Sequence, residues 1–129
     1  MVIDSSAVLA IFFDEPERSA FVDLISGDDE ACMGAPNLLE ASMIVEARQG
    51  KAGCRDLDEL AGVLELRIVP FDVAHVEAAR DAFRRYGKGR HRAALNFGDC
   101  CAYGLARTLD APLLFKGNDF SLTDVKRAL

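Results

Sequence analysis

The feature that most constrains this chain is a regular alternation of short apolar runs with segments whose apolar residues repeat at helical spacing. This order of elements is typical of α/β domains built on a mainly parallel sheet. We therefore predict an α/β fold in which each strand is followed by one or more helices. The expected strands are residues 1–4, 31–33, 67–71 and 113–115.

The helices are predicted from their capping residues and apolar faces. Ser5 or Ser6 can cap the first helix, and Pro16 suits the first turn of the second, which ends at Gly27. The first helix is expected at 7–13. The later helices are expected at 36–50, through Leu57, Leu60, Ala61 and Leu64, at 73–86, at 98–109 and at 122–128. The inner face of the 73–86 helix is expected to carry Val76, Ala79, Phe83 and Tyr86.

The size and composition limit what kind of protein this is. With 129 residues and a mass of 14.0 kDa, we expect one domain spanning residues 1–129. No apolar run approaches the length of a membrane span, and the start of the chain lacks a basic segment followed by an apolar one. The four cysteines form no CxxC pair and have no histidine at zinc-site spacing, so a reducing cytoplasm is the expected location.

The charge distribution is uneven. The net charge of −6 and the pI of about 4.8 argue against a broad nucleic-acid-binding face. Cations nevertheless concentrate in residues 84–92, where intervening glycines would let the backbone follow a polyanion. This segment is interpreted either as an RNA-guiding arm or as a solvated loop, and its cations are Arg84, Arg85, Lys88, Arg90 and Arg92.

Four acidic residues stand at or just beyond the carboxyl ends of predicted strands, or in the first turns of the helices that follow. They are Asp4, Glu40, Asp99 and Asp119. Because the carboxyl ends of parallel strands meet at one edge of a sheet, these acids are expected to converge in one pocket. Converging carboxylates repel one another and select hard cations, so the constellation predicts a Mg²⁺ or Mn²⁺ site.

Each acid also has a structural interpretation when it is taken alone. Asp4 can be a turn residue or a helix cap, and Asp119 an exposed loop acid. Glu40 shares a helical stripe with Met43, Ile44 and Ala47, so it needs a partner, which Arg48 could supply in a salt bridge. Asp99 can serve the helix dipole at the start of its helix.

Four segments together resemble the PIN-domain ribonucleases, and among them the VapC toxins of VapBC toxin–antitoxin modules. They are MVIDSSAVLAIFFDEPE, PNLLEASMIVEARQG, ALNFGDCCAYGLAR and PLLFKGNDFSLTD, and the resemblance runs nearly end to end. It implies a three-layer α/β/α sandwich, an endoribonuclease that uses the four acids as metal ligands, and Ser6 as a supporting hydroxyl. Many relatives carry an acid where this chain has Asn118, and a carboxylate attracts Mg²⁺ more strongly than an amide, so Asp119 is the preferred fourth ligand.

The resemblance also implies partners: a VapB-like antitoxin whose tail occupies the acidic groove, an RNA substrate, and a homodimer within the toxin–antitoxin complex. Catalysis through bound metal requires no protein nucleophile. His75 is expected on a helix surface and His91 in a basic loop, so paired histidine catalysis is not expected. Lys116 lies beside the predicted pocket and could contact phosphate.

Two alternatives stay open from the sequence. A phosphate-receiver signalling domain also combines this size with an acidic Mg²⁺ pocket and a lysine after a late strand. Its acidic pair should directly follow the first strand, whereas Asp28 and Asp29 precede the second strand. A noncatalytic PIN-like binding module is the other alternative, and the presence of an acid at all four positions argues against it.

Overall fold

The computed structural model describes residues 1–129 as one four-stranded, all-parallel sheet with helices on both faces. The strand order is β3-β2-β1-β4, so the first strand lies in the interior of the sheet. The elements along the chain are β1 Val2–Ile3, α1 Ser5–Phe12, α2 Arg18–Ser26, β2 Cys32–Gly34, α3 Ala35–Val63, β3 Arg67–Val69, α4 Val73–Tyr86, α5 Phe97–Thr108 and β4 Leu113–Leu114. The predicted α/β class and parallel sheet are confirmed.

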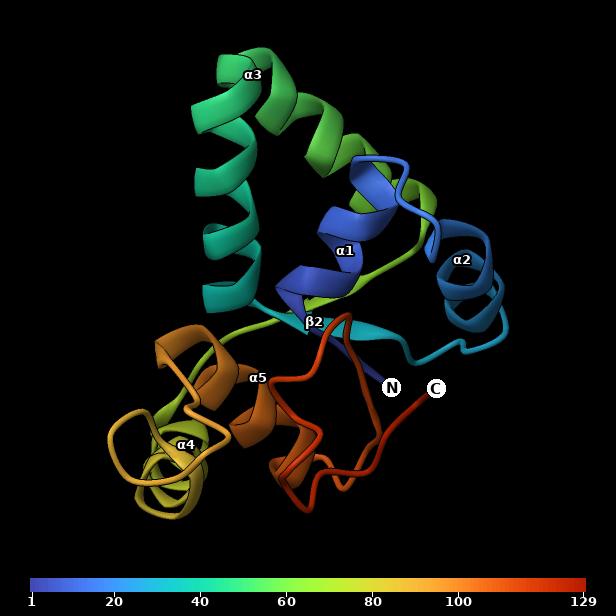
Figure 1. Ribbon diagram of the computed structural model, residues 1–129. Helices are drawn as coiled ribbons and strands as arrows, with labels where there is room; N and C mark the ends of the chain where they lie inside the picture. The colour runs from blue at the N-terminus through green and yellow to red at the C-terminus, as the bar shows by residue number, and fades with distance from the viewer.

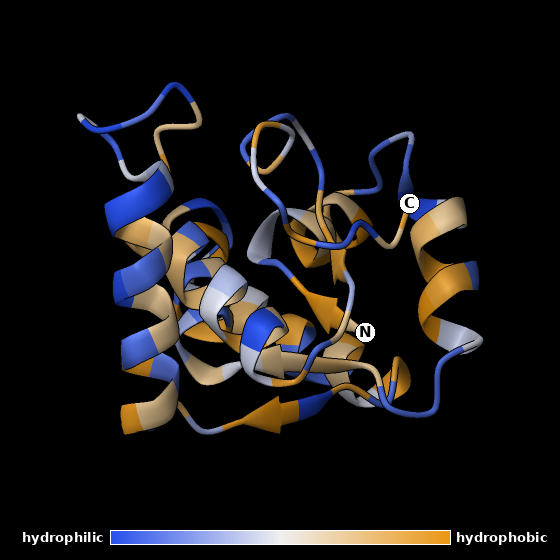
Figure 2. Ribbon diagram, turned by 90° about the horizontal axis from the view of Figure 1, so that it is seen from below, coloured by the Kyte–Doolittle hydropathy of each residue, from blue (hydrophilic) through white to orange (hydrophobic).

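The layers follow from the alternation of side chains along the strands. Neighbouring residues in a strand point to opposite faces of the sheet. Ile3, Met33 and Leu114 accordingly belong to one buried cluster, which α1, α2 and α3 cover. Val2, Cys32 and Leu113 belong to a second cluster on the other face, which is covered mainly by α5. Figure 1 shows α1, α2 and α3 on one side of the sheet and α4 and α5 on the other, and the strands are largely hydrophobic in Figure 2.

The long helix α3 combines two of the predicted helices. Gly50 has φ 70° and ψ −166°, a backbone conformation that interrupts the helix and that only glycine adopts readily. The chain therefore turns at Gly50, and the two halves of α3 form the bent arm visible at the top of Figure 1. No helix is long and apolar enough to cross a membrane.

The terminal helix predicted at 122–128 is wrong. After β4 the chain makes turns and then runs beside that strand, where Leu113 donates a backbone hydrogen bond to Lys126 and accepts one from Ala128. The side chain of Asp124 accepts hydrogen bonds from Tyr103 at 2.5 Å and from Arg85 at 2.9 Å. These contacts hold the segment extended, and they outweigh its local helical pattern.

The predicted inner face of α4 is confirmed only in part: Ala79 and Tyr86 pack against the core, but Phe83 does not. The helix has the predicted bounds, but its buried residues are His75 and Ala82, while Phe83 is 43% exposed. His75 closes a capping box at the start of α4: its backbone N–H donates to Asp72 Oδ1, and its Nδ1 accepts from the Asp72 backbone N–H at 3.0 Å. This cap turns the imidazole inward, so His75 is not a surface residue.

Candidate active site

Asp4 is the residue at which β1 ends and α1 begins. It is only 3% exposed and caps α1, with its Oδ2 accepting hydrogen bonds from the Ser6 backbone N–H at 3.0 Å and from Ser6 Oγ at 2.5 Å. Its other oxygen, Oδ1, is buried and has no hydrogen-bond partner. A buried carboxylate oxygen without a partner is costly, so Asp4 retains one oxygen for a ligand.

The hydroxyl of Ser6 ties Asp4 to the neighbouring strand. Besides donating to Asp4, Ser6 Oγ accepts a hydrogen bond from the Lys116 backbone N–H at 3.0 Å, just beyond β4. The α1 cap, predicted at Ser5 or Ser6, is therefore Asp4 itself, and Ser6 fixes both the carboxylate and the strand end. The Lys116 ammonium turns away to pair with Glu15 and with Glu17, the latter at 3.2 Å.

Glu40 lies in the second turn of α3 and is half-buried. Ser5 Oγ donates a hydrogen bond to its Oε1. The predicted partner, Arg48, instead places its guanidinium over the Phe13 ring, 4.5 Å from the centroid. The apolar stripe predicted around Glu40 is exposed, since the Met43 side chain is 63% accessible. The face of α3 that packs against α1 carries the smaller side chains of Ala41 and Val45 instead.

Asp99 occupies the first turn of α5 and forms a reciprocal cap with Asn96. Its backbone N–H donates to Asn96 Oδ1 at 2.9 Å, and its Oδ2 accepts from the Asn96 backbone N–H at 3.0 Å. Burial, together with the negative charges of Asp4, Asp119 and Glu40, raises the pKa of Asp99 to about 7, although the hydrogen bond from the Asn96 backbone N–H lowers it. Asp99 therefore has the structural role of capping α5, and the charges of the other three acids also act on its carboxylate.

The four acids gather at the carboxyl edge of the sheet, as the spacing predicted. Burial and the charge of Glu40 together raise the pKa of Asp4 to about 6, although the hydrogen bonds from Ser6 lower it. Asp119 and Asn118 are both exposed on the loop after β4, and it is the Asp119 charge that acts on Asp99. The gathering is loose: no three His, Cys, Asp or Glu side chains meet closely enough to hold a metal ion by themselves.

The donor set nevertheless fits a hard divalent cation. It consists of carboxylate oxygens, one of them the unpartnered Oδ1 of Asp4, and such oxygens suit Mg²⁺ and Mn²⁺. A cation among the acids would also offset the repulsion that adds to burial in raising the pKa values of Asp4 and Asp99.

Three residues that the sequence interpretation missed position these acids. Ser5 orients Glu40, and the buried Asn37 donates from Nδ2 to the Gly98 carbonyl at 3.0 Å, joining α3 to α5. A Cβ on Gly98 would collide with the Glu40 carboxylate. One signal was present in the sequence: Asn37 precedes Glu40 by three residues and so shares its side of the helix. Gly98 gave no signal, because its neighbour is distant in sequence.

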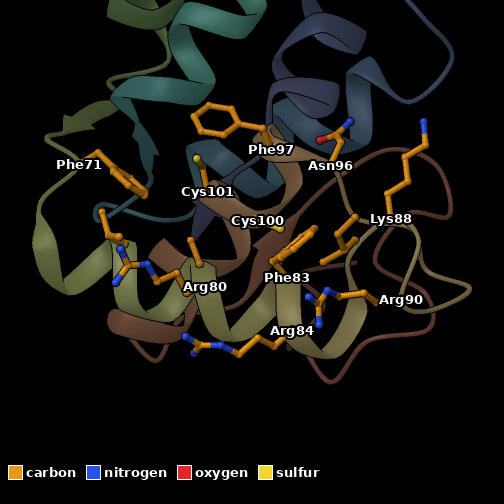
Figure 3. A pocket seen from close by; sticks show the side chains of 13 residues that line it. Phe71, Arg80, Phe83, Arg84, Lys88, Arg90, Asn96, Phe97, Cys100 and Cys101 are labelled. Carbon is orange, nitrogen blue, oxygen red and sulfur yellow. The ribbon is translucent and has the colours of Figure 1, made fainter.

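The cations of residues 84–92 do not act as one group. Arg85 pairs with Asp124 and contacts the hydroxyls of Tyr103 and Tyr86. Arg84, Lys88 and Arg90 instead line a groove between α4 and α5, shown in Figure 3. Arg92 is exposed, and His91 accepts a hydrogen bond at Nδ1 from the Ala93 backbone N–H at 3.0 Å.

Comparison with known proteins places this architecture in a family. The profile described as "PIN domain" matches residues 1–126. The chain is 46% identical over 125 residues to a ribonuclease VapC of Mycolicibacterium smegmatis, covering 97% of each chain. It is 45% identical to ribonuclease VapC30 of Mycobacterium tuberculosis, covering 97% of this chain and 95% of the relative. The chain belongs to the VapC ribonucleases of the PIN-domain family.

Solved structures agree with the fold. The crystal structure of Mycobacterium tuberculosis VapC20, described as a sarcin-ricin loop cleaving toxin, superimposes with a TM-score of 0.76 at 14% identity, covering 96% of this chain and 95% of that one. VapBC2 from Rickettsia felis, bound to a DNA fragment from its promoter, gives a TM-score of 0.73 at 13% identity, with 93% and 89% covered. The PIN-like α/β/α sandwich is thereby confirmed.

Proposed function

We propose that this chain is the toxin of a toxin–antitoxin pair and a metal-dependent endoribonuclease that hydrolyses RNA phosphodiester bonds. The observation that carries the proposal is the cluster of four acids at the carboxyl edge of the sheet, with one buried oxygen of Asp4 unpartnered. The VapC family membership supports the reaction class. The protein works in the cytoplasm as one domain spanning residues 1–129.

The mechanism assigns each residue a separate task. Asp4, Glu40, Asp99 and Asp119 would hold Mg²⁺ or Mn²⁺, which when bound polarises the phosphoryl group and lowers the pKa of water. Ser6 holds Asp4 with one oxygen free, and Ser5 holds Glu40. Asp119 is assigned as the fourth ligand rather than Asn118, because a carboxylate attracts Mg²⁺ more strongly than an amide does. The product is expected to carry a 5′-phosphate.

Metal removal tests the reaction class. Protein stripped with EDTA is expected to lose cleavage of single-stranded RNA, and added Mg²⁺ or Mn²⁺ is expected to restore it. Asp119→Asn and Asn118→Ala separate the two candidates for the fourth ligand, with only the first expected to weaken Mg²⁺ binding in a calorimetric titration. Full activity in excess EDTA would contradict the proposal.

The two other functional classes fit the geometry less well. In a phosphate receiver the acidic pair would lie at the carboxyl end of a strand, whereas Asp28 accepts hydrogen bonds from the Met1 amino group and from the Glu30 backbone N–H. Acetyl phosphate labelling of an aspartate would support that alternative. A noncatalytic module would tolerate Asp4→Asn without loss of any activity.

The partner is a VapB-like antitoxin whose basic tail enters the acidic pocket, and the toxin pairs as a homodimer within that complex. Four carboxylates attract an Arg or Lys side chain, which would compete with the metal. Calorimetry with the antitoxin tail is expected to show weaker binding to Glu40→Gln protein and at saturating Mg²⁺. Affinity unchanged by both would place inhibition away from the carboxylates.

A further inference from the structure

A groove between α4 and α5 is not used by the chemistry described above. It has a cavity volume of about 660 Å³, in the range of sites that take a small organic molecule. Its floor is apolar and includes Cys100 and Cys101, whose thiols are neutral at physiological pH because burial raises the pKa of each to about 11. Figure 3 shows both sulfurs between the aromatic rings of the groove.

The groove presents aromatic side chains to solvent. Phe97 is 79% exposed and Phe83 is 43% exposed, although both are large apolar residues. Phe97 is the first residue of α5, and Asn96 before it lies at the same end of the groove. Exposed rings beside a cavity are suited to stack on a planar ligand.

The rim of the groove is cationic, on a protein whose net charge is −6. Arg84, Lys88 and Arg90 line it, and none of the three pairs with a carboxylate. Arg90 lies over the Phe83 ring, 5.1 Å from its centroid. This contrasts with Arg85 and Lys116, whose charges are balanced by acids. The free cations therefore favour an anionic partner over a second apolar surface.

The groove lies next to the acidic site, because Asn96 and Phe97 line it and Asp99 follows in the first turn of α5. Asn96 caps Asp99, and Phe97 precedes it by two residues. A planar group lodged against Phe97 would therefore place an attached phosphate between the cationic rim and the carboxylates. A single-stranded nucleic acid combines a planar ring, a flanking anion and a phosphodiester bond, and the proposed ribonuclease function makes that strand RNA.

We infer that the groove between α4 and α5 binds an unpaired RNA base next to the cleaved phosphodiester, with Phe97 as the stacking residue and Arg84, Lys88 and Arg90 as contacts to flanking phosphates. This rests on the proposed ribonuclease function and assigns the groove and the residues that position its substrate. The substrate is single-stranded at this position, because a base held in a helix cannot enter the groove.

The inference is tested without cleavage by titrating a dye-labelled, short single-stranded oligoribonucleotide with the full chain in EDTA. The fluorescence anisotropy of the dye measures binding. Phe97→Ala is expected to lower affinity about fivefold to a hundredfold, the range for loss of one stacked base. Phe97→Trp is expected to retain affinity. Val63→Ala removes an equally exposed apolar side chain far along α3 and is the matched control, expected to bind as the wild type.

Two further arms separate stacking on Phe97 from attraction by charge alone. An oligonucleotide with one abasic residue at the binding position is expected to bind wild-type and Phe97→Ala proteins equally, since stacking is lost in both. Lys88→Gln with Arg90→Gln is expected to reduce the slope of log affinity against log salt by about 0.7 for each lost phosphate contact.

The outcomes separate this inference from the proposed function. If metal-dependent cleavage is present but Phe97→Ala binds RNA as the wild type does, the base-binding groove is wrong and the ribonuclease stands. If Phe97→Ala instead changes the sedimentation of the protein from dimer to monomer with RNA affinity retained, the groove is an interface between copies. If the wild-type chain neither binds nor cleaves RNA, both proposals fail.

Discussion

The two faces of the sheet bury cores of nearly equal size but end in different surfaces. The cluster under α1, α2 and α3 has 15 buried residues, and the one under α4 and α5 has 14. Yet the eight-residue α1 buries five of its residues, whereas the 14-residue α4 buries only His75 and Ala82. One face is therefore closed around its helix, and the other is left open as a groove.

This difference separates the face of the sheet that stabilises the fold from the face that is free to bind a ligand. The closed face holds Asp4 at the start of the buried helix α1, and Ser5 of the same helix holds Glu40. The open face carries unpaired cations and exposed rings at the start of α5, beside Asp99. Substitutions on the closed face should change stability, and substitutions on the open face should change interactions.

The largest expected effect tests whether the two faces of the sheet contribute differently to stability. Ile11→Ala empties a fully buried position of α1 and is expected to lower the free energy of unfolding by about 2–5 kcal/mol. Phe83→Ala is expected to cost less than about 1 kcal/mol, because the ring is partly solvated. Urea unfolding at one pH measures both, and equal losses would mean that the two faces contribute equally to stability.

Gly98 joins the two faces, so its replacement should affect activity more than folding. In Gly98→Ala the new Cβ would push the Glu40 carboxylate aside, and misplacement of a reacting group by about 1 Å reduces activity roughly a hundredfold. Gly62→Ala, where a Cβ meets nothing, is the control. Cleavage rates and circular dichroism measure this, and a Gly98→Ala protein with wild-type activity would remove Glu40 from the site.

The pH dependence of stability tests the buried acids in EDTA. The folded pKa values of Asp4 and Asp99, about 6 and about 7, lie above the ordinary value of 3.8, so the folded state binds more protons between these values. Their contribution to the free energy of unfolding must therefore decrease as pH rises from about 4 to about 7.

Asp99→Asn removes one of these titrations. Between pH 4 and pH 8, the free energy of unfolding of this variant is expected to rise relative to that of the wild type by on the order of 2 kcal/mol. This is somewhat less than the full pKa shift of Asp99 would give. The exposed Asp58→Asn is the control. Urea unfolding at both pH values measures the difference, and parallel behaviour of the two variants would show that Asp99 is ionised without penalty.

The smallest effect concerns the link between α3 and α5. Asn37→Leu removes the donor to the Gly98 carbonyl and also an unpartnered buried oxygen, Oδ1, so the stability change should be small. Mg²⁺ affinity is expected to fall roughly tenfold, because Asp99 and Glu40 lose their common support. Calorimetric titration measures it, and unchanged affinity would leave Asn37 as a packing residue only.

Much of this arrangement could be predicted from sequence because it depends on local patterns. The abrupt change from apolar residues to an acid at the end of β1 predicted the place of Asp4 at the sheet edge. Errors arose where distant residues decide. The segment 122–128 is extended because Tyr103 and Arg85 hold Asp124, and Phe83 is exposed because the capped His75 takes the inner side of α4.

The site itself was predicted less completely than the fold. Its four acids were identified as charges at strand ends, but the partners that orient them lie in other elements. Ser5 reaches Glu40 across 35 positions of sequence, and Asn37 reaches Gly98 across 61. No local pattern encodes such pairings.

The position of β1 inside the sheet has a consequence for synthesis of the protein. Asp4 is synthesised well before Leu114, but its backbone N–H donates to the Leu114 carbonyl, and Ser6 accepts from Lys116. A chain growing from its N-terminus therefore displays its first carboxylate long before the strand that fixes it exists. The acids assemble only when residues 113–119 have emerged, so translation itself delays the appearance of a nuclease beside the RNA that encodes it.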